Sequence, residues 1–398
     1  MPSSRPRIST AERRSRLAVR QHLATSSQAA SPLQASNDIV GFHGTDPISV
    51  YLAAWARVEG FRTCTLETAL YEERSLLKIL GMRRTMFVVP IELAGIIQAA
   101  CTGSIARGQR ARLVRMIEDA GITDAGQEWL DGVEAETLEV LHRLGEATAA
   151  ELTKEVAGLR EQISFGEGRT WQGTVGVSTR LLFLLSAEGR IIRGRPRGSL
   201  VSSLYRWAPL DTWLGGSLPA IPKDLAQAEL VRRWLAAFGP GTRRDVQWWT
   251  GWTVAEVRRG LESTRAVEVD LEDGGAGFIS PDDVDPATPS HASWVAFLPC
   301  LDPTTMGWHE RDWYLGAHKD RLFDTNGNAG PSIWLDGRIV GGWAQRRSGE
   351  VVTRIREDVG AERAAQVATK AADLEAWLGD LRVIPRFRTP VEKELMEG

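Results

Sequence analysis

Residues 177–209 read VSTRLLFLLSAEGRIIRGRPRGSLVSSLYRWAP, and this stretch decides which fold we expect. Its first part, 177–189, has leucines at helical spacing and stops at Gly189, a residue common just past a helix C-terminus. The remainder, 190–209, has two strand-like runs separated by a basic turn that contains glycine and proline. We therefore predict a helix followed by a β-hairpin, which is how the wing of a winged helix is built.

Two further predicted helices precede this stretch. TLEVLHRLG (137–145) has apolar residues three and four positions apart, and ATAAELTKEV (147–156) follows with a threonine or alanine as its cap. The order helix, helix, helix, wing is that of a winged-helix domain, which we place at 126–215. The basic residues of this domain fall on its wing.

The same order recurs at 222–282. Three helices and one strand pair are predicted there: 224–239, 242–251, 253–263 and the pair around AVEVDLEDGGAGFISP. Thr253 and Glu256 have the spacing of a capping box, in which each side chain bonds to the backbone of the other residue. Glu272 and Asp273 make the turn of this wing acidic, so we expect it to be a poor phosphate contact.

The N-terminal part has a similar but less regular order, which we interpret as a first winged helix at 11–125. It has four predicted helices and one strand: 11–24, 47–59, 66–80, 91–120 and the strand 82–90. The first ten residues, 1–10, are predicted to be a disordered basic tail.

The last part of the chain changes in character. Residues 290–387 are predicted to be β-rich, with Asp336-Gly337 as a hairpin turn, a helix at 360–378 and a strand at LRVIPRF. Residues 388–398 form a C-terminal tail. The expected fold class is therefore mainly α with small β (α+β): three tandem winged-helix domains plus a β-rich C-terminal part.

Charge is unevenly distributed along a chain of 398 residues whose formal net charge is −3. One basic cluster lies in the N-terminal head and another on the wing at 190–206, and arginine predominates in both. The planar guanidinium of arginine suits phosphates and guanine edges. We predict double-stranded DNA as the partner, and as its contacts the five arginines of the wing: Arg190, Arg193, Arg195, Arg197 and Arg206.

Several classes of protein are disfavoured. No apolar run approaches the roughly 20 residues needed to span a bilayer, and the first residues lack an apolar signal core. We therefore expect a cytoplasmic, nucleoid-associated protein that does not bind membranes and is monomeric. Cys64, Cys101 and Cys300 match no metal or redox spacing, so we expect no metal site and no cofactor.

The stretch GFHGTDPISVYLAAWARV (41–58) contains the candidate catalytic residues. His43, Gly44, Thr45 and Asp46 form a polar group immediately before a helix with proline in its first turn, and we call these four residues the polar knot. A neutral imidazole can accept a proton from water near neutral pH, since its unperturbed pKa is about 6.5. Alternatively, Asp46 is a helix N-cap, and the other residues belong to an ordinary turn.

Taken together, these pieces resemble the AlkZ/YcaQ-type DNA glycosylase family. The resemblance covers most of the chain, from about 16 to about 387. It is carried by LAVRQHL (17–23), the stretch at 41–58, LYEERSLLKILGMRRTMFVVP (70–90), RRDVQWWTGWTVAEVRRGL (243–261), FLPCLDPTTMGWHERDWYL (297–315) and LDGRIVGGW (335–343). The resemblance implies three tandem winged helices, a β-rich C-terminal part and base removal from DNA.

The same resemblance places the catalytic motif of the family on the polar knot. That motif is glutamine, an aliphatic residue, then glutamine or aspartate, and here His43, Gly44 and Thr45 stand at these positions. Asp46 matches the aspartate before the helix proline, and Phe87 stands where the family often has histidine. The location of the site is kept, and its chemistry is altered.

Two functions follow from this interpretation. In the first, the protein is a DNA repair glycosylase that hydrolyses the N-glycosidic bond of alkylated purines. His43 would be the general base, Thr45 would orient the water, and Asp46 would either stabilise the sugar cation or hold the imidazole tautomer. In the second, it is a non-catalytic DNA-binding protein, a transcriptional regulator or lesion binder. A third hypothesis is a scaffold that uses winged helices for protein contacts.

Overall fold

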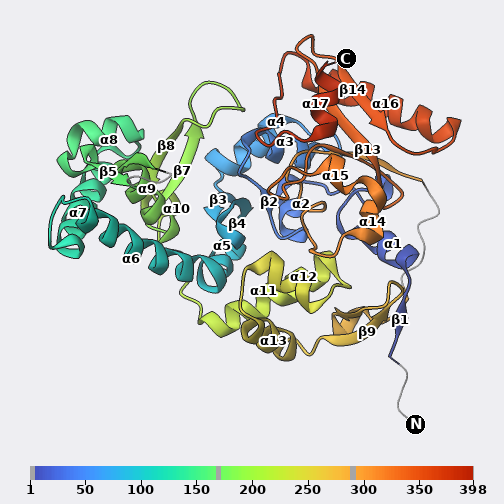
Figure 1. Ribbon diagram of the computed structural model, residues 1–398, viewed down its shortest axis with the longest axis horizontal. Helices are drawn as coiled ribbons and strands as arrows, with labels where there is room; N and C mark the ends of the chain where they lie inside the picture. The colour runs from blue at the N-terminus through green and yellow to red at the C-terminus, as the bar shows by residue number, and fades with distance from the viewer. Residues whose placement is uncertain (1–4, 167–171, 287–292, 398) are drawn as a thin grey trace.

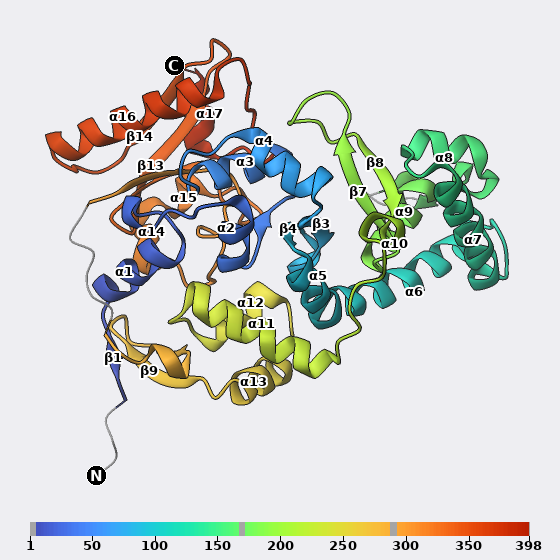
Figure 2. The same cartoon turned by 180° about the vertical axis from the view of Figure 1, so that it is seen from behind.

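The computed structural model describes residues 5–166, 172–286 and 293–397. Within these residues the chain is a mixed α and β fold in which helices predominate and the strands form five small sheets. The expected α+β class is therefore confirmed. Figure 1 shows residues 126–215, in green, as a lobe at one end of the molecule, joined to a larger body through α6 (Gly103–Asp119), and Figure 2 shows the same arrangement from behind.

The lobe is separate because it has its own apolar core. Leu141, Leu181 and Leu185 are fully buried within it, and Ile117 at the end of α6 packs into the same cluster. A different cluster joins the N-terminal part, the 222–282 unit and the C-terminal part, and its largest buried side chains include Trp234 and Trp334. Most of the apolar burial thus links three segments that are far apart in the sequence.

The N-terminal part contains the three-stranded sheet that carries the polar knot. Its elements are β1 (Arg7–Ile8), α1 (Thr10–Arg20), α2 (Pro32–Asp38), β2 (Phe42–His43), α3 (Pro47–Trp55), α4 (Thr63–Glu67), β3 (Leu76–Leu80), β4 (Met86–Pro90) and α5 (Ile91–Ile97). The strand order is β2-β4-β3, and both pairs are antiparallel. Phe42 lies opposite Val88, and Val88 lies opposite Lys78.

The prediction of one helix over 66–80 is wrong in its second half. The helical turns end at Glu72, and Leu76–Leu80 forms β3 at the edge of this sheet. All five residues of β3 are buried. A short apolar run fits a buried strand as well as a buried helix, so periodicity alone could not separate the two. The predicted strand at 82–90 is confirmed for Met86–Pro90.

The expectation of a disordered tail is wrong for residues 5–10, whereas residues 1–4 lie outside the described residues. Strand β1 pairs in parallel with β9 (Val267–Leu271), and Thr10 N–H donates to Glu272 Oε2 at 2.7 Å. Arg13 pairs with Asp273 at 3.2 Å. The acidic turn of the 222–282 unit therefore neutralises part of the charge of the basic N-terminal head.

The lobe at 126–215 has the predicted helices and hairpin. Its elements are α7 (Gly126–Leu144), α8 (Ala149–Glu155), β5 (Gln162–Phe165), β6 (Gly173–Gly176), α9 (Val177–Ala187), β7 (Ile191–Pro196), β8 (Tyr205–Pro209) and α10 (Leu210–Leu214). The antiparallel pairing of β7 with β8 confirms the hairpin, and Thr148 forms a capping box with Glu151 at the start of α8. The β5–β6 pair was missed from the sequence.

The unit at 222–282 also has its predicted elements. They are α11 (Lys223–Phe238), α12 (Arg243–Thr250), α13 (Val254–Ser263), β9 and β10 (Ala276–Ile279). The capping box of Thr253 with Glu256 is confirmed, and Thr242 forms another with Asp245. Local capping thus sets both helix starts.

The C-terminal part is an antiparallel sheet, in the order β11-β12-β13-β14, with helices around it. Its elements are β11 (Val295–Leu298), α14 (Asp312–Leu315), α15 (Lys319–Leu322), β12 (Ser332–Leu335), β13 (Arg338–Gln345), β14 (Val351–Ile355), α16 (Ala361–Leu378) and α17 (Pro390–Glu397). Asp336 and Gly337 both have positive φ, as a two-residue hairpin turn requires. The strand predicted at 381–387 is absent: Leu381 O and Val383 N–H bond to the side chain of Gln345 and not to a strand. Among the described helices, none is both long and apolar enough to cross a membrane.

Candidate functional site

The polar knot is fixed to the edge of the N-terminal sheet by backbone bonds. His43 ends β2, and Gly44 N–H donates to Met86 O at 2.7 Å. Thr45 Oγ1 accepts from Met86 N–H at 3.3 Å. Asp46 then takes the N-cap position of α3. Strand β4 therefore holds His43, Gly44 and Thr45, and Asp46 follows them at the start of the helix.

Asp46 occupies the N-cap position but does not cap the helix with its side chain. The carboxylate accepts no bond from the amides of α3. Instead Ser49 Oγ and Cys300 Sγ both donate to Asp46 Oδ2, each at 3.1 Å. Burial raises the pKa of the Cys300 thiol well above its usual range, and the Asp46 charge raises it further, so the thiol stays protonated as a donor. The expected capping role is thus corrected, and the carboxylate is held by a residue 254 positions away.

His43 lies in the core rather than in an open site. Its ring meets Phe87 edge-on, with centroids 5.2 Å apart, and the residue is 3% exposed. Within the described residues its Nδ1 atom has no hydrogen-bond partner. Burial, and to a lesser degree Arg83, lowers the pKa of His43 to about 3. The expectation of an ordinary imidazole pKa near 6.5 is therefore wrong.

This burial predicts how stability depends on pH. An unfolded His43 binds a proton below about pH 6.5, whereas the folded ring stays neutral down to about pH 3. The stabilisation from burying the neutral ring is fully present above pH 6.5 and is lost as the pH falls towards 3, at about 1.4 kcal/mol per unit. Relative to a His43→Gln variant, the wild type should therefore lose about 2 kcal/mol between pH 7 and pH 5, measured by urea unfolding. Parallel pH profiles would show that the folded ring titrates normally.

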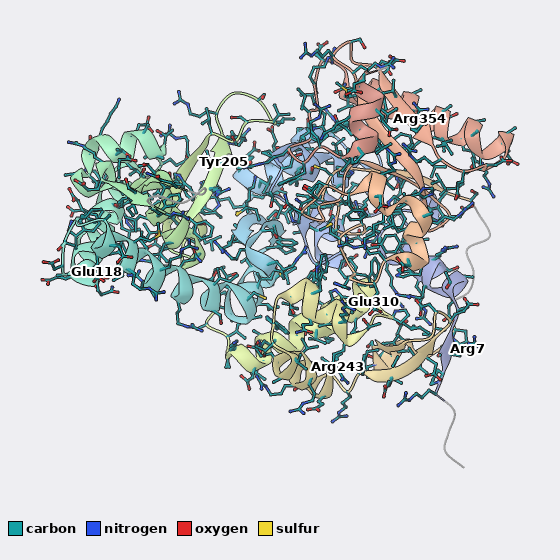
Figure 3. The ribbon with its side chains drawn as sticks, in the orientation of Figure 1. Arg7, Glu118, Tyr205, Arg243, Glu310 and Arg354 are labelled. Atoms are coloured by element: carbon teal, nitrogen blue, oxygen red, sulfur yellow. The ribbon has the colours of Figure 1, made fainter. Side chains whose placement is uncertain are left out.

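A cavity of about 600 Å³ lies between the polar knot and the lobe. Thr45 lines it from the knot, the first turn of α8 lines it from the lobe, and Arg386 lines it from the C-terminal part. The hairpin β7–β8 contributes the remaining wall: Arg193, Arg197, Ser203, Leu204, Tyr205 and Trp207. Figure 3 labels Tyr205, which projects from this hairpin. Two sites predicted separately, the knot and the wing, therefore meet at one cavity.

The five wing arginines do not share one environment. Three are paired with carboxylates: Arg190 with Glu134 at 3.6 Å, Arg195 with Glu67 at 3.4 Å and Glu72 at 3.6 Å, and Arg206 with Glu146 at 3.4 Å and Glu151 at 3.7 Å. Arg193 lies between the rings of Tyr205 and Trp207, at 5.2 and 5.3 Å from their centroids. Arg197 is exposed. Only Arg193 and Arg197 of the five line the cavity.

Lys78 is a functional candidate that sequence reasoning missed. It lies on β3, its stem runs past Gly44, and a Cβ at Gly44 would be 3.5 Å from Lys78 Cε. Its Nζ donates to Tyr205 OH at 3.0 Å, and the residue is 8% exposed. Burial lowers the pKa of Lys78 to about 7 with help from Arg193, and Asp46 opposes the shift. One signal was visible: a single lysine within the apolar run LLKIL.

Comparisons with known proteins agree on one family. A family model described as DNA glycosylase AlkZ-like matches residues 37–377. Among solved structures, the chain is similar to the Streptomyces sahachiroi DNA glycosylase AlkZ, with a TM-score of 0.71 and 19% sequence identity over 96% of this chain and 99% of that chain. This likeness shows a shared fold. No curated protein sequence matches the chain significantly.

Proposed function

Because the chain belongs to the AlkZ-like DNA glycosylase family, we propose that it hydrolyses the N-glycosidic bond of alkylated purines in double-stranded DNA. The observation that carries the proposal is the position of Thr45 and Asp46. Thr45 lines the cavity, and the next residue, Asp46, is a buried carboxylate that accepts no bond from the backbone amides of its helix. A cavity of about 600 Å³ has room for an extruded base, and Tyr205 and Trp207 offer it aromatic walls.

Base removal requires the enzyme mainly to stabilise the charge of the sugar cation and to position a water molecule. An alkylated purine is already cationic and leaves readily, so the barrier lies in the sugar cation and in placing a water beside it. A carboxylate fixed in a water-poor site stabilises such a cation far more than it would in bulk water. We assign this role to Asp46 and assign the orientation of the water to Thr45 Oγ1, which keeps acceptor capacity beyond its bond from Met86.

The role of His43 in the proposal is changed by its burial. A buried ring with a pKa of about 3 is a weak general base for a water near neutral pH. We therefore propose that His43 supports the knot through its contact with Phe87 and does not take the proton.

We also propose that 11–125, 126–215 and 222–282 are three winged-helix units. In the second unit α7, α8 and α9 precede the β7–β8 hairpin, and in the third α11, α12 and α13 precede the β9–β10 pair. The first unit has the sheet β2-β4-β3 in the place of a simple wing. On the second hairpin Arg197 is exposed and Arg193 lines the cavity, and neither is paired with a carboxylate of the described residues, so we place the DNA contact there.

The contact with DNA gives a testable salt dependence. Replacing Arg193 and Arg197 by alanine should flatten the log–log dependence of duplex affinity on salt by about two units, since each phosphate contact contributes about 0.9. Arg195→Ala is the matched control on the same hairpin, because Glu67 and Glu72 already neutralise that guanidinium. Fluorescence anisotropy between 50 and 300 mM salt measures the slopes. A slope unchanged in the double variant would mean that these arginines contact no phosphate.

The test of the glycosylase proposal is release of free alkylated purine from randomly methylated duplex DNA. The wild type should release base well above the spontaneous rate, and His43→Ala should retain most of that rate while losing stability. If the wild type binds the duplex but releases base no faster than buffer does, the alternative holds: a non-catalytic DNA-binding protein. The burial of His43 at the position that the family motif occupies is the observation that favours this alternative.

A further inference from the structure

Lys78 is an amine without a counter-ion in the wall between the polar knot and the hairpin. In the described part of the chain no carboxylate lies within ion-pairing distance of Nζ, and its hydrogen bond goes to the phenol of Tyr205. Its ammonium would sit 4.6 Å from the centroid of the same ring. A buried charge with so little compensation is costly, and a residue such as Met would fill the same space without that cost. The cost of burying this amine indicates that it has a chemical role.

We propose that Lys78 gives the protein a second activity, in which its amine condenses with the aldehyde of an abasic 2-deoxyribose in DNA and the DNA strand is cleaved on the 3′ side. This inference rests on the proposed function only in that base release would produce the abasic sugar beside Lys78. The chemical class of substrate is a masked aldehyde flanked by two phosphates.

The location suits this substrate. Tyr205, the partner of Nζ, lines the cavity together with Thr45 and Arg193, so a sugar in the cavity reaches Nζ by displacing one phenol. Arg197 and Arg386 line the same cavity and offer positive charge to the flanking phosphates. The stem of Lys78 passes directly over Gly44, which places the amine beside the polar knot and not at a remote surface.

The environment also favours the reactive form of the amine. Only a neutral amine attacks a carbonyl, and lysines that form imines are activated by burial or by a neighbouring cation. Lys78 has both, since it is buried and Arg193 adds positive charge. With a pKa of about 7, half of the Lys78 amines are neutral at pH 7. An ordinary lysine, with a pKa of about 10.4, has roughly one neutral amine in 2,500 at that pH.

The reaction requires only groups that the protein, the DNA and water supply. The Lys78 nitrogen adds to C1′ of the open-chain sugar, and the resulting carbinolamine loses water to form an imine. A base then removes a proton from C2′, the C2′–H electrons form the C2′–C3′ double bond, and the C3′–O bond breaks with its electron pair leaving on the 3′ phosphate. Asp46, whose charge acts on Lys78, is the carboxylate that we assign to this proton. Hydrolysis of the imine releases the unsaturated aldehyde and restores the amine, so no oxidant or reductant is consumed.

Borohydride trapping tests the proposal directly. A duplex with one abasic site, prepared beforehand by enzymatic removal of uracil, is incubated with the full-length protein and sodium borohydride, which reduces an imine to a stable amine. The wild type should form a covalent protein–DNA adduct that survives denaturing electrophoresis, and peptide mapping should place it on Lys78. Lys78→Arg keeps a hydrogen-bond donor and most of the stem but removes the amine, and it should lower adduct yield at least 100-fold. Lys154→Arg is the matched control, because Lys154 is an exposed lysine in the last turn of α8, the helix whose first turn lines the cavity, and it should trap like the wild type.

A wild type that binds abasic duplex but forms no adduct overturns the proposal, and so does an adduct that maps to another amine or persists in Lys78→Arg. If Lys78→Arg folds poorly, judged by its melting temperature and its affinity for undamaged duplex, the mapped position in the wild type decides alone. Because the abasic site is preformed, a protein that fails to release alkylated bases can still pass this test, so the two proposals fail separately.

The pH dependence of strand cleavage is the second readout. Tyr205, Arg193 and Asp46 are the titratable or charged groups that act on Lys78. Burial raises the pKa of Tyr205, so the phenol stays neutral near pH 7, whereas burial lowers the pKa of Arg193 from its ordinary value. Single-turnover cleavage, corrected for cleavage without protein, should rise about tenfold per pH unit below 7 and level off above it. A rate that keeps rising towards pH 10 would instead indicate an ordinary surface lysine.

Discussion

Asp46→Asn should lower the release of alkylated purines about 100- to 1,000-fold, because it removes the only negative charge of the polar knot while keeping its shape. The asparagine carbonyl can still accept from Ser49 Oγ and Cys300 Sγ, and asparagine is as good at a helix N-cap as aspartate. The change therefore removes charge and leaves the local hydrogen bonds. Single-turnover release of base from methylated duplex DNA measures this loss of rate.

Two controls separate this effect from a loss of folding or of DNA binding. Asp38→Asn removes a carboxylate from α2 of the same part of the chain, where Asp38 pairs with His22 and lies outside the cavity wall, so its rate should match that of the wild type. Duplex affinity of Asp46→Asn should stay within a few-fold of the wild type, since Asp46 makes no phosphate contact. Equal rates of base release for Asp46→Asn and the wild type would remove Asp46 from the mechanism.

Asp302→Ala should destabilise the folded protein by about 3–5 kcal/mol, the cost of leaving a buried charge without its partner. Asp302 and Arg57 are both fully buried, and two guanidinium nitrogens donate to the two carboxylate oxygens, at 2.6 and 2.9 Å. The same guanidinium also donates to Thr304 Oγ1 and Ala53 O. This pair ties the end of α3 to the segment after β11, so its loss weakens the support of the knot. Urea unfolding measures the change.

A double-mutant cycle isolates the pair itself. Arg57→Met should also be strongly destabilising, because it leaves the Asp302 carboxylate buried and unpaired. The double variant Arg57→Met/Asp302→Ala should be less destabilised than the sum of the two single variants by 1–3 kcal/mol, since no unpaired charge remains. Exactly additive single effects would mean that the two side chains do not interact in the folded state.

Much of the fold could be predicted because its signals are local. The capping box of Thr253 with Glu256 acts over three residues, Gly189 ends α9 with a positive φ, and Asp336-Gly337 closes a hairpin in two residues. These features depend on the conformations of a few neighbouring residues, which the sequence specifies directly. The wing at 190–207 was found in the same way, from a basic turn between two strand-like runs.

The errors have a different cause. The run LLKIL was assigned to a helix because its apolar content fits both a buried helix and a buried strand, and only the pairing with β4 decides between them. The N-terminal residues 5–10 were expected to be disordered because their partner, β9, lies more than 250 residues further along the chain. A pairing partner so far along the chain produces no recognisable pattern in the local sequence.

For the candidate site, the sequence by itself determined that His43, Thr45 and Asp46 stand together at the start of α3, and that basic residues gather on the hairpin. Only the tertiary structure decided what those residues can do. It buried His43 against Phe87, held Asp46 through Cys300, 254 positions away, and brought Lys78 to Tyr205, 127 positions away. The physical reason is that pKa values and hydrogen-bond partners depend on burial and on charges within a few ångströms. Packing between segments that are distant in the sequence determines which groups lie that close.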